Sequence, residues 1–178
     1  MMANRTVESL WRWSGEGSLP VVIDASSCSL GLAGEASSAL TEENRERHGQ
    51  LEILDSIVWA KRLLPNLEVR EKLASVAVHP TCSTRHAGLE RQLREIAAAM
   101  AEEVVQPIRS TCCGMAGDRG MLHPELTKSA TAEEAAELAG SSHDAYLCSN
   151  RTCEIGLQEG TGAAYESFLI PLERITRA

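Results

Sequence analysis

Val76-Ala77-Val78-His79-Pro80-Thr81-Cys82 is a short apolar run, rich in β-branched residues, that leads directly to a cysteine. Similar runs lie at residues 21–23, 104–108 and 145–147. The apolar residues in these runs are continuous rather than alternating, which is typical of strands that are buried on both faces of a parallel sheet. The sequence therefore predicts four short strands of this kind.

Amphipathic helical patterns separate the predicted strands. We expect helices over residues 51–64, 89–100, 133–138 and 165–175. The first ends near Pro65, the third stops at Gly140, and Pro171 should bend the last. Residues 36–49 are polar and should form a loop or a loosely packed helix. Strands separated by helices imply right-handed crossovers, so we expect an α/β fold with a small parallel sheet of about four strands and helices on both faces.

Length and composition restrict the class of protein. The 178 residues fit one domain, and 25 acidic against 17 basic residues give a net charge of −8. This acidity argues against a nucleic-acid partner, which would need a basic patch. No apolar run approaches the roughly 18 residues of a transmembrane segment, and the N-terminus has no signal-peptide pattern. Six cysteines in a reducing, cytoplasmic compartment favour metal binding or redox chemistry over structural disulfides.

All the cysteines lie at or just beyond the carboxyl ends of predicted strands. They are Cys28, Cys82, Cys112, Cys113, Cys148 and Cys153. Ligands bind at the carboxyl edge of an open parallel sheet, so we expect cysteines that are distant in the sequence to meet at one rim. Each also lies near a predicted helix N-terminus, where thiolates are favoured.

The adjacent pair Cys112-Cys113, followed by Gly114, is the most informative feature. A disulfide between neighbouring cysteines is strained, so an ordinary structural bridge is not expected. Two adjacent thiolates can instead bind neighbouring metal atoms, and Gly114 allows the backbone to approach closely. The alternative is a pair of buried core cysteines. The further cysteines at strand ends favour a metal or cluster site.

Two nine-residue segments resemble each other. Residues 24–32 read Asp-Ala-Ser-Ser-Cys-Ser-Leu-Gly-Leu, residues 149–157 read Ser-Asn-Arg-Thr-Cys-Glu-Ile-Gly-Leu, and both follow an apolar strand. This similarity favours an internal duplication. We therefore expect residues 1–49 to be the remnant of a first unit plus a connection. Residues 50–178 should be a complete second unit, packed as one globular domain that belongs to a longer protein.

The cysteine spacing resembles that of the CCG family of cysteine-rich domains. Cys82 is followed after 29 residues by Cys112-Cys113-Gly114, and after 35 more by Asn150-Arg-Thr-Cys153. The family includes the B subunit of heterodisulfide reductase and the iron–sulfur subunits of glycolate oxidase and anaerobic glycerol-3-phosphate dehydrogenase. The motifs look most similar to the C-terminal part of FAD-linked D-lactate or D-2-hydroxyacid dehydrogenases.

The resemblance implies a metal centre bound by thiolates. It assigns Cys82, Cys112, Cys113 and Cys153 as metal ligands, and Cys148 is a further cofactor-binding candidate with a plain core role as the alternative. One residue departs from the pattern, because Asn150 stands where the family has the first Cys of Cys-x-x-Cys. Four thiolates are enough for a four-iron, four-sulfur (4Fe-4S) cluster or for zinc, so both stay open.

The resemblance also implies an electron-transfer role. The chain would be the iron–sulfur module of an FAD-linked 2-hydroxyacid oxidoreductase and would not be active alone. It would pass electrons from the flavin domain of the parent protein, where FAD binds, to a quinone, cytochrome or thiol partner. It would act in the cytoplasm, or at the inner face of the membrane through partners. Alternatives are a structural zinc or metal-free docking domain and a thiol–disulfide site at Cys112-Cys113.

Two histidines flank the first of these cysteines. His79 and His86 could ligate a metal or hydrogen-bond to a cluster sulfur. A surface histidine or a satisfied core histidine is the commoner role for this residue type. We therefore predict a structural role for both, and we expect the four proposed ligand cysteines to gather at one sheet edge.

Overall fold

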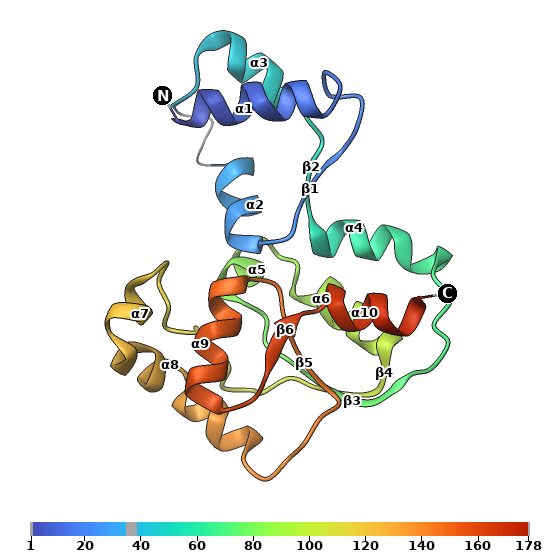
Figure 1. The fold of residues 1–178 in the computed structure, drawn as a ribbon, viewed down its shortest axis with the longest axis vertical. Helices are drawn as coiled ribbons and strands as arrows, with labels where there is room; N and C mark the ends of the chain where they lie inside the picture. The colour runs from blue at the N-terminus through green and yellow to red at the C-terminus, as the bar shows by residue number, and fades with distance from the viewer. Residues whose placement is uncertain (1, 35–38, 178) are drawn as a thin grey trace.

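A four-stranded parallel sheet forms the centre of the fold. The computed structural model describes residues 2–34 and 39–177 (Figure 1). The strand order is β4-β3-β5-β6. The strands are β3 Leu73–Val78, β4 Ala101–Val105, β5 Ala145–Cys148 and β6 Tyr165–Ser167. Helices connect consecutive strands of this sheet, so the predicted α/β class is confirmed.

Helices cover both faces of the sheet, as predicted. Side chains alternate across a strand, so Val76 and Val78 of β3 face an aliphatic core, whereas Ala77 between them faces a second core. The aliphatic core is closed by α4 Ser56–Leu63, α6 Glu90–Met100 and α10 Leu169–Thr176. The second core is closed by α8 Pro124–Leu138 and α9 Arg151–Thr161, and it contains three buried cysteines.

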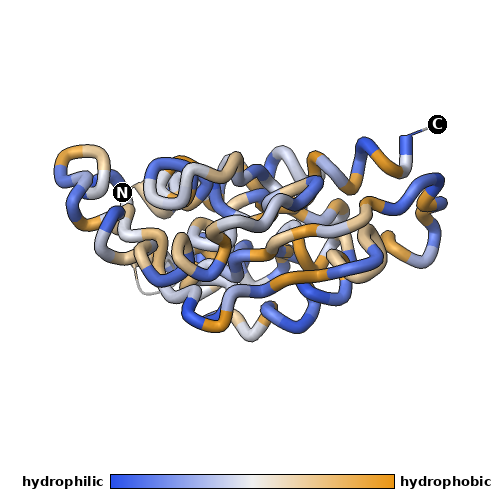
Figure 2. Tube along the Cα trace, turned by 90° about the horizontal axis from the view of Figure 1, so that it is seen from below, coloured by the Kyte–Doolittle hydropathy of each residue, from blue (hydrophilic) through white to orange (hydrophobic). Residues whose placement is uncertain are grey.

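The helix α6 shows how the sequence pattern produces this packing. Leu93, Ile96 and Met100 recur at helical spacing and are fully buried, while Arg91 and Arg94 are exposed. Burying one such aliphatic side chain contributes about 1.5–3 kcal/mol. Figure 2 shows hydrophilic and hydrophobic segments alternating along the helices, as expected for elements with one face on a core.

The N-terminal part of the chain packs around a small core of its own. The helices α1 Met2–Trp13 and α3 Glu42–Gln50 lie side by side at one end of the molecule (Figure 1). Val7, Leu40 and Leu51 are buried there. Next to this pair, β1 Val21–Ile23 runs parallel to β2 Ile53–Asp55, and α2 Ser26–Ala33 follows β1. Within the described residues these two strands form a separate sheet, so the predicted strand at 21–23 exists but does not join the central sheet.

Residues 51–64 are not one helix, which corrects the prediction. The strand β2 occupies their first part, and α4 begins after Asp55. The Asp55 side chain accepts a hydrogen bond from the backbone N–H of Ile57 at 2.9 Å. A carboxylate at this position caps a helix start. Periodicity did not separate strand from helix, because Leu51 and Leu54 are apolar and buried in either arrangement.

Residues 165–175 also divide, into the strand β6 and the helix α10. Pro171 lies in the first turn of α10, where the N–H that it lacks would have no helical partner. Pro171 therefore fits within the first turn of the helix, which begins at Leu169. The strand expected over 104–108 ends at Val105, because Pro107 cannot donate to the sheet, and Ile108 is 94% exposed.

Two further helices have bounds that differ from the expected ones. The helix predicted over 133–138 already begins at Pro124, a residue that suits a first helical position. In the polar segment 36–49, the helix α3 begins at Glu42 after Thr41, whose hydroxyl accepts the backbone N–H of Asn44 at 3.4 Å. Residues 36–38 of that segment lie outside the described residues.

The two similar nine-residue segments have the same local structure. The strands β1 and β5 end directly before their segments, and α2 and α9 each begin at the third residue. Ala25 and Asn150 are the matching N-cap residues. The segments also touch: Ser26 donates its backbone N–H to the Ser149 carbonyl at 3.0 Å and its hydroxyl to the Ser149 hydroxyl at 2.9 Å. The similarity therefore extends to the backbone, while the division into units 1–49 and 50–178 stays a prediction.

Candidate metal centre

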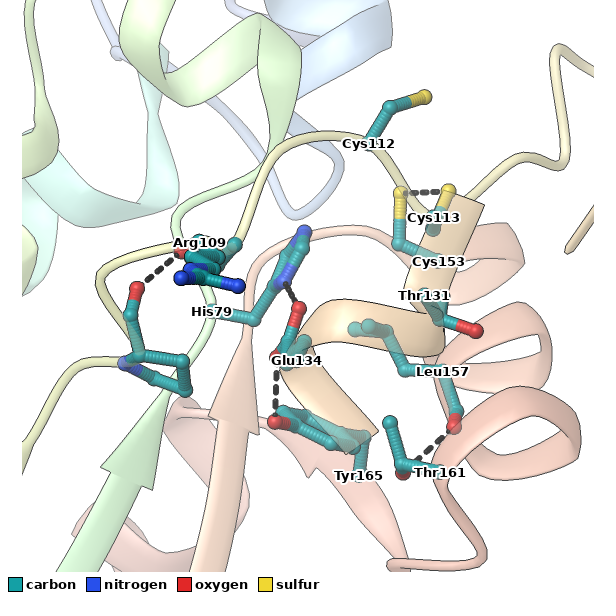
Figure 3. Close-up of polar contacts among 12 residues, drawn as sticks. His79, Arg109, Cys112, Cys113, Thr131, Glu134, Cys153, Leu157, Thr161 and Tyr165 are labelled. Carbon is teal, nitrogen blue, oxygen red and sulfur yellow. Dashed lines mark hydrogen bonds and ion pairs between the residues drawn. The ribbon is translucent and has the colours of Figure 1, made fainter. Parts of the chain in front are cut away.

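Cys113 and Cys153 are in direct contact in the second core. Cys113 lies in the loop between β4 and α7 Arg119–Leu122, and Cys153 lies in the first turn of α9. Their Sγ atoms are hydrogen-bonded at 2.9 Å, and both side chains are buried (Figure 3). This separation exceeds the roughly 2.05 Å of a disulfide bond. All the cysteines are free thiols.

The loop that carries Cys112 and Cys113 is fixed to two neighbouring elements. The Glu137 carboxylate of α8 accepts the backbone N–H groups of residues 108 and 109, at 2.7 and 2.9 Å. Arg85 of α5 Cys82–His86 donates to the Ser110 hydroxyl of the loop at 2.8 Å. These bonds bring the loop, α8 and the helix that begins with Cys82 to one edge of the sheet.

Two glycines allow the cysteine loop to touch the helices. Gly114 has a φ of +75°, and a Cβ there would lie 2.7 Å from the Leu126 carbonyl oxygen and from Thr127 Cα of α8. A Cβ at Gly156 of α9 would lie 2.9 Å from the carbonyl oxygen of Cys113. The close packing of the loop against both helices therefore needs residues without a side chain.

The contact between Cys113 and Cys153 favours ionisation of one of the two thiols. The hydrogen bond with Cys153 lowers the pKa of Cys113 to about 6, assisted by the Met115 backbone N–H and the charge of His79, although burial acts in the opposite direction. The same hydrogen bond, together with burial, raises the pKa of Cys153. The pair therefore shares one proton near neutral pH. A thiolate is the form of cysteine that binds metals.

In the metal-free protein the Cys113 thiol should ionise near pH 6, which the ultraviolet absorbance of thiolates measures. In Cys153→Ala the hydrogen-bond donor is gone, so the pKa of Cys113 should rise toward its ordinary 9.0. The pKa of Cys113 is lower in the folded protein than in the unfolded chain. Ionisation of Cys113 therefore stabilises the fold fully above pH 9, and this stabilisation is lost as the pH falls toward 6. Cys28→Ala changes an exposed cysteine and should keep the step near pH 6. An unchanged step in Cys153→Ala would contradict this assignment.

Cys112 and Cys82 lie on the more accessible side of the pair. Cys112 is half-buried, and its Sγ accepts the backbone N–H of Gly114 at 3.4 Å. Burial raises the pKa of Cys112, and the charges of Cys113 and Cys82 add to this rise. Cys82 is the exposed first residue of α5 and is near enough to Cys112 for its charge to act there. The region thus combines a buried cysteine pair with two accessible cysteines.

Cys148 and Asn150 flank the buried pair without joining it. Cys148 ends β5, is fully buried and donates to the Asn150 carbonyl at 3.7 Å. Burial raises the pKa of Cys148 to about 12, so it is a neutral thiol at physiological pH. The side-chain amide of Asn150, at the position where the family pattern has a cysteine, donates to Cys153 Sγ at 3.6 Å. Cofactor binding by Cys148 stays a prediction.

His79 is a candidate functional residue, although the sequence favoured a structural role for it over metal binding. It is fully buried, whereas His86 is exposed as expected. Its Nδ1 is bonded to Glu134 of α8, but within the described part of the chain its buried Nε2 has no hydrogen-bond partner. A satisfied core histidine is therefore not what the structure contains. The alternation of side chains along a strand could have indicated this role. It places His79 on the same side as Ala77, which faces the cysteines.

The donor chemistry of this region fits a thiolate-bound metal. No three His, Cys, Asp or Glu side chains among the described residues converge in a metal-binding arrangement. The buried sulfurs of Cys113 and Cys153 are nevertheless in contact, and the unpartnered His79 nitrogen lies nearby. Exposed side chains change rotamer rapidly. A site that used all four cysteines would therefore need the side chains of Cys82 and Cys112 to turn toward the buried pair.

The sheet, the paired cysteines of its loop and the cysteine at the start of α9 define a cysteine-rich α/β domain. Residues 76–158 match the family model described as CCG, cysteine-rich domain. This segment belongs to the CCG family, so the predicted family is confirmed. It contains Cys82, Cys112, Cys113, Cys148 and Cys153.

A search among curated proteins finds no match. No described helix is long and apolar enough to cross a membrane.

Proposed function

We propose that the chain is the iron–sulfur electron-transfer module of an FAD-linked 2-hydroxyacid oxidoreductase of the D-lactate or glycolate type. The CCG family match indicates a metal or redox module. The contact between Cys113 and Cys153 carries the proposal further, because it keeps a thiolate and a thiol together beside two accessible cysteines. Four cysteines can hold a 4Fe-4S cluster.

The residues of this chain would hold the cluster and set its reduction potential. The proposed ligands are Cys82, Cys112, Cys113 and Cys153. The backbone N–H of Gly114 and the amide of Asn150 donate to ligand sulfurs and so stabilise negative charge there. Burial of Cys113 and Cys153 limits solvent access, which also affects the potential. A bound cluster would supply the one-electron carrier.

The proposed partners follow from this role. Electrons would come from the flavin domain of the parent protein, where FAD binds, and would pass to a quinone, cytochrome or thiol partner. The module would act in the cytoplasm, or at the inner face of the membrane through its partners. Residues 1–49 would be the remnant of a first CCG unit, which the matching geometry of residues 24–32 and 149–157 supports.

Anaerobic reconstitution of the full chain with iron and sulfide tests the proposal. We expect a brown protein with about four iron and four sulfide ions per chain. Its visible absorbance should fall on chemical reduction and return on reoxidation. A chain that stays colourless after this treatment but binds zinc cleanly would contradict the electron-transfer function.

A structural zinc site in a docking domain is the second candidate. Asn150 favours it, because an amide in place of a thiolate leaves four cysteines, and four ligands complete a zinc site. Metal analysis of anaerobically purified protein would support this function if it gave one zinc and no acid-labile sulfide.

Thiol–disulfide chemistry is a third candidate, favoured by the contact between Cys113 and Cys153. In this reaction two thiols form one disulfide and release two electrons and two protons to a disulfide-bearing partner. Loss of two thiols on mild oxidation, reversed by a thioredoxin-like reductant, would identify it.

A further inference from the structure

Two other buried side chains hold His79 in place. His79 Nδ1 is 2.7 Å from Glu134 Oε2, and the Tyr165 hydroxyl donates to Glu134 Oε1 at 2.7 Å. The exposed fractions of His79, Glu134 and Tyr165 are 0%, 1% and 3%. His79 follows β3, Glu134 belongs to α8, and Tyr165 begins β6. Three separate elements therefore fix the orientation of the imidazole ring.

The bond to Glu134 determines which ring nitrogen has a free lone pair. A carboxylate only accepts hydrogen bonds, so Nδ1 of His79 carries the proton, and Nε2 of a neutral ring is then an acceptor. Burial, followed by the charge of Glu134, raises the pKa of Tyr165, which keeps its hydroxyl protonated as the second donor. Metal-binding histidines usually donate their other N–H to a carboxylate in this way.

The free nitrogen faces the cysteines. Buried polar atoms are nearly always hydrogen-bonded, so a buried atom without a partner needs an explanation. His79 Nε2 has none among residues 2–34 and 39–177. Figure 3 shows the ring edge opposite Glu134 directed toward the loop that carries Cys112 and Cys113. His79 also lies within electrostatic range of Cys113. A proton on Nε2 would make the ring positive, and a metal at Nε2 would take the place of that proton.

We propose that His79 Nε2 is a ligand of the metal centre formed by Cys113 and Cys153, and that Glu134 and Tyr165 are its positioning residues. This inference rests on the proposed function and adds a ligand that the cysteine pattern does not contain. The centre is then a mixed nitrogen–sulfur site. Zinc binds four nitrogen and sulfur ligands, so in a zinc site His79 would take the place of one of the four cysteines. Histidine can likewise replace cysteine on iron in iron–sulfur centres.

The departure at Asn150 is consistent with a nitrogen ligand. The Asn150 amide is engaged as a hydrogen-bond donor to Cys153 Sγ, so the site has one thiolate fewer than the family pattern. A further donor to the proposed centre would have to offer an electron pair toward the buried cysteines. His79 Nε2 offers one, and its orientation is already fixed without any metal.

The test uses the full chain, metal-free and loaded anaerobically with cadmium-113, a thiolate-binding stand-in for zinc. With histidines labelled with nitrogen-15, a coordinated imidazole gives a scalar coupling between cadmium and nitrogen. We expect this coupling on one histidine of the unmodified chain and its loss in His79→Gln. Glu134→Gln should bind cadmium about 10–100-fold more weakly, because partners of ligating histidines have effects of this size.

His86→Gln is the matched control, because His86 is an exposed histidine on the other side of Cys82. It should keep the coupling and the affinity. If His79→Gln does not fold, the spectrum of the unmodified chain still decides whether a histidine is bound. Cadmium bound without nitrogen coupling overturns the role of His79 and leaves the proposed function standing. Absence of cadmium binding also overturns it, and reconstitution with iron and sulfide then decides the proposed function separately.

Discussion

Cys113→Ala should abolish metal or cluster binding by the full chain. Cys113 is the cysteine whose pKa falls to about 6, so it supplies a thiolate at neutral pH, and it is already in contact with Cys153. Even a hydrogen-bond partner of a metal ligand changes affinity by about 10–100-fold, so loss of a central ligand should exceed about 100-fold. Iron and sulfide content after anaerobic reconstitution measures the effect.

Loss of binding in this variant must be separated from loss of the fold. Cys113→Ala removes one sulfur atom and its hydrogen bonds with Cys153 and with the Met115 backbone N–H. Each costs about 1 kcal/mol, so the circular dichroism spectrum should be unchanged. Cys28→Ala is the matched control, because Cys28 is the counterpart of Cys153 in the similar segment but is exposed on α2. It should reconstitute normally. Full iron and sulfide content in Cys113→Ala would contradict the proposed centre.

Gly114→Ala should destabilise the domain by about 2–5 kcal/mol. The left-handed backbone at φ +75° costs an alanine about 1–2 kcal/mol. The added Cβ would lie 2.7 Å from backbone atoms of Leu126 and Thr127, and overpacking of this kind costs about 1–3 kcal/mol. For a chain of this size the melting temperature should fall by roughly 4–20 °C. Thermal unfolding of the metal-free chain measures this, because bound metal would add its own stabilisation.

Gly88→Ala separates the two contributions. Gly88 has a φ of +71°, but a Cβ there would have nothing within 4 Å. Its substitution should cost only the backbone strain of about 1–2 kcal/mol. The difference between the two variants therefore measures the packing of the cysteine loop on α8. Equal destabilisation would show that this packing does not depend on glycine.

Continuous apolar runs predicted the main strands of the fold, but two three-residue strands escaped detection. The runs at residues 76–78 and 145–147 lie in β3 and β5. The strands Ile53–Asp55 and Tyr165–Ser167 each end in a polar residue and merge with the helical pattern that follows. Pairing with β1 and β5, which are distant in the sequence, creates these strands. The local pattern of apolar residues cannot reveal pairing with a distant segment.

The candidate site was predictable only in part. The rule that ligands bind at the carboxyl edge of a parallel sheet pointed to the cysteine region, but not to which cysteines are buried. Glu134 was beyond sequence reasoning, because it lies between charged or small residues of a helix and looks like a solvated side chain. It is buried only because His79 and Tyr165, each distant in the sequence, bond to its two oxygens.

The alternation of side chains across β3 gives the domain two unlike sides. Every proposed ligand lies at the loops or on the α8 and α9 side of the sheet, while the opposite side is a layer of aliphatic side chains and Phe168. A protein that docked on that layer would be separated from the sulfurs by the thickness of the sheet and its core. If the chain has the proposed electron-transfer function, we therefore expect electron donor and acceptor to approach the same side, over the exposed Cys82 and the half-buried Cys112.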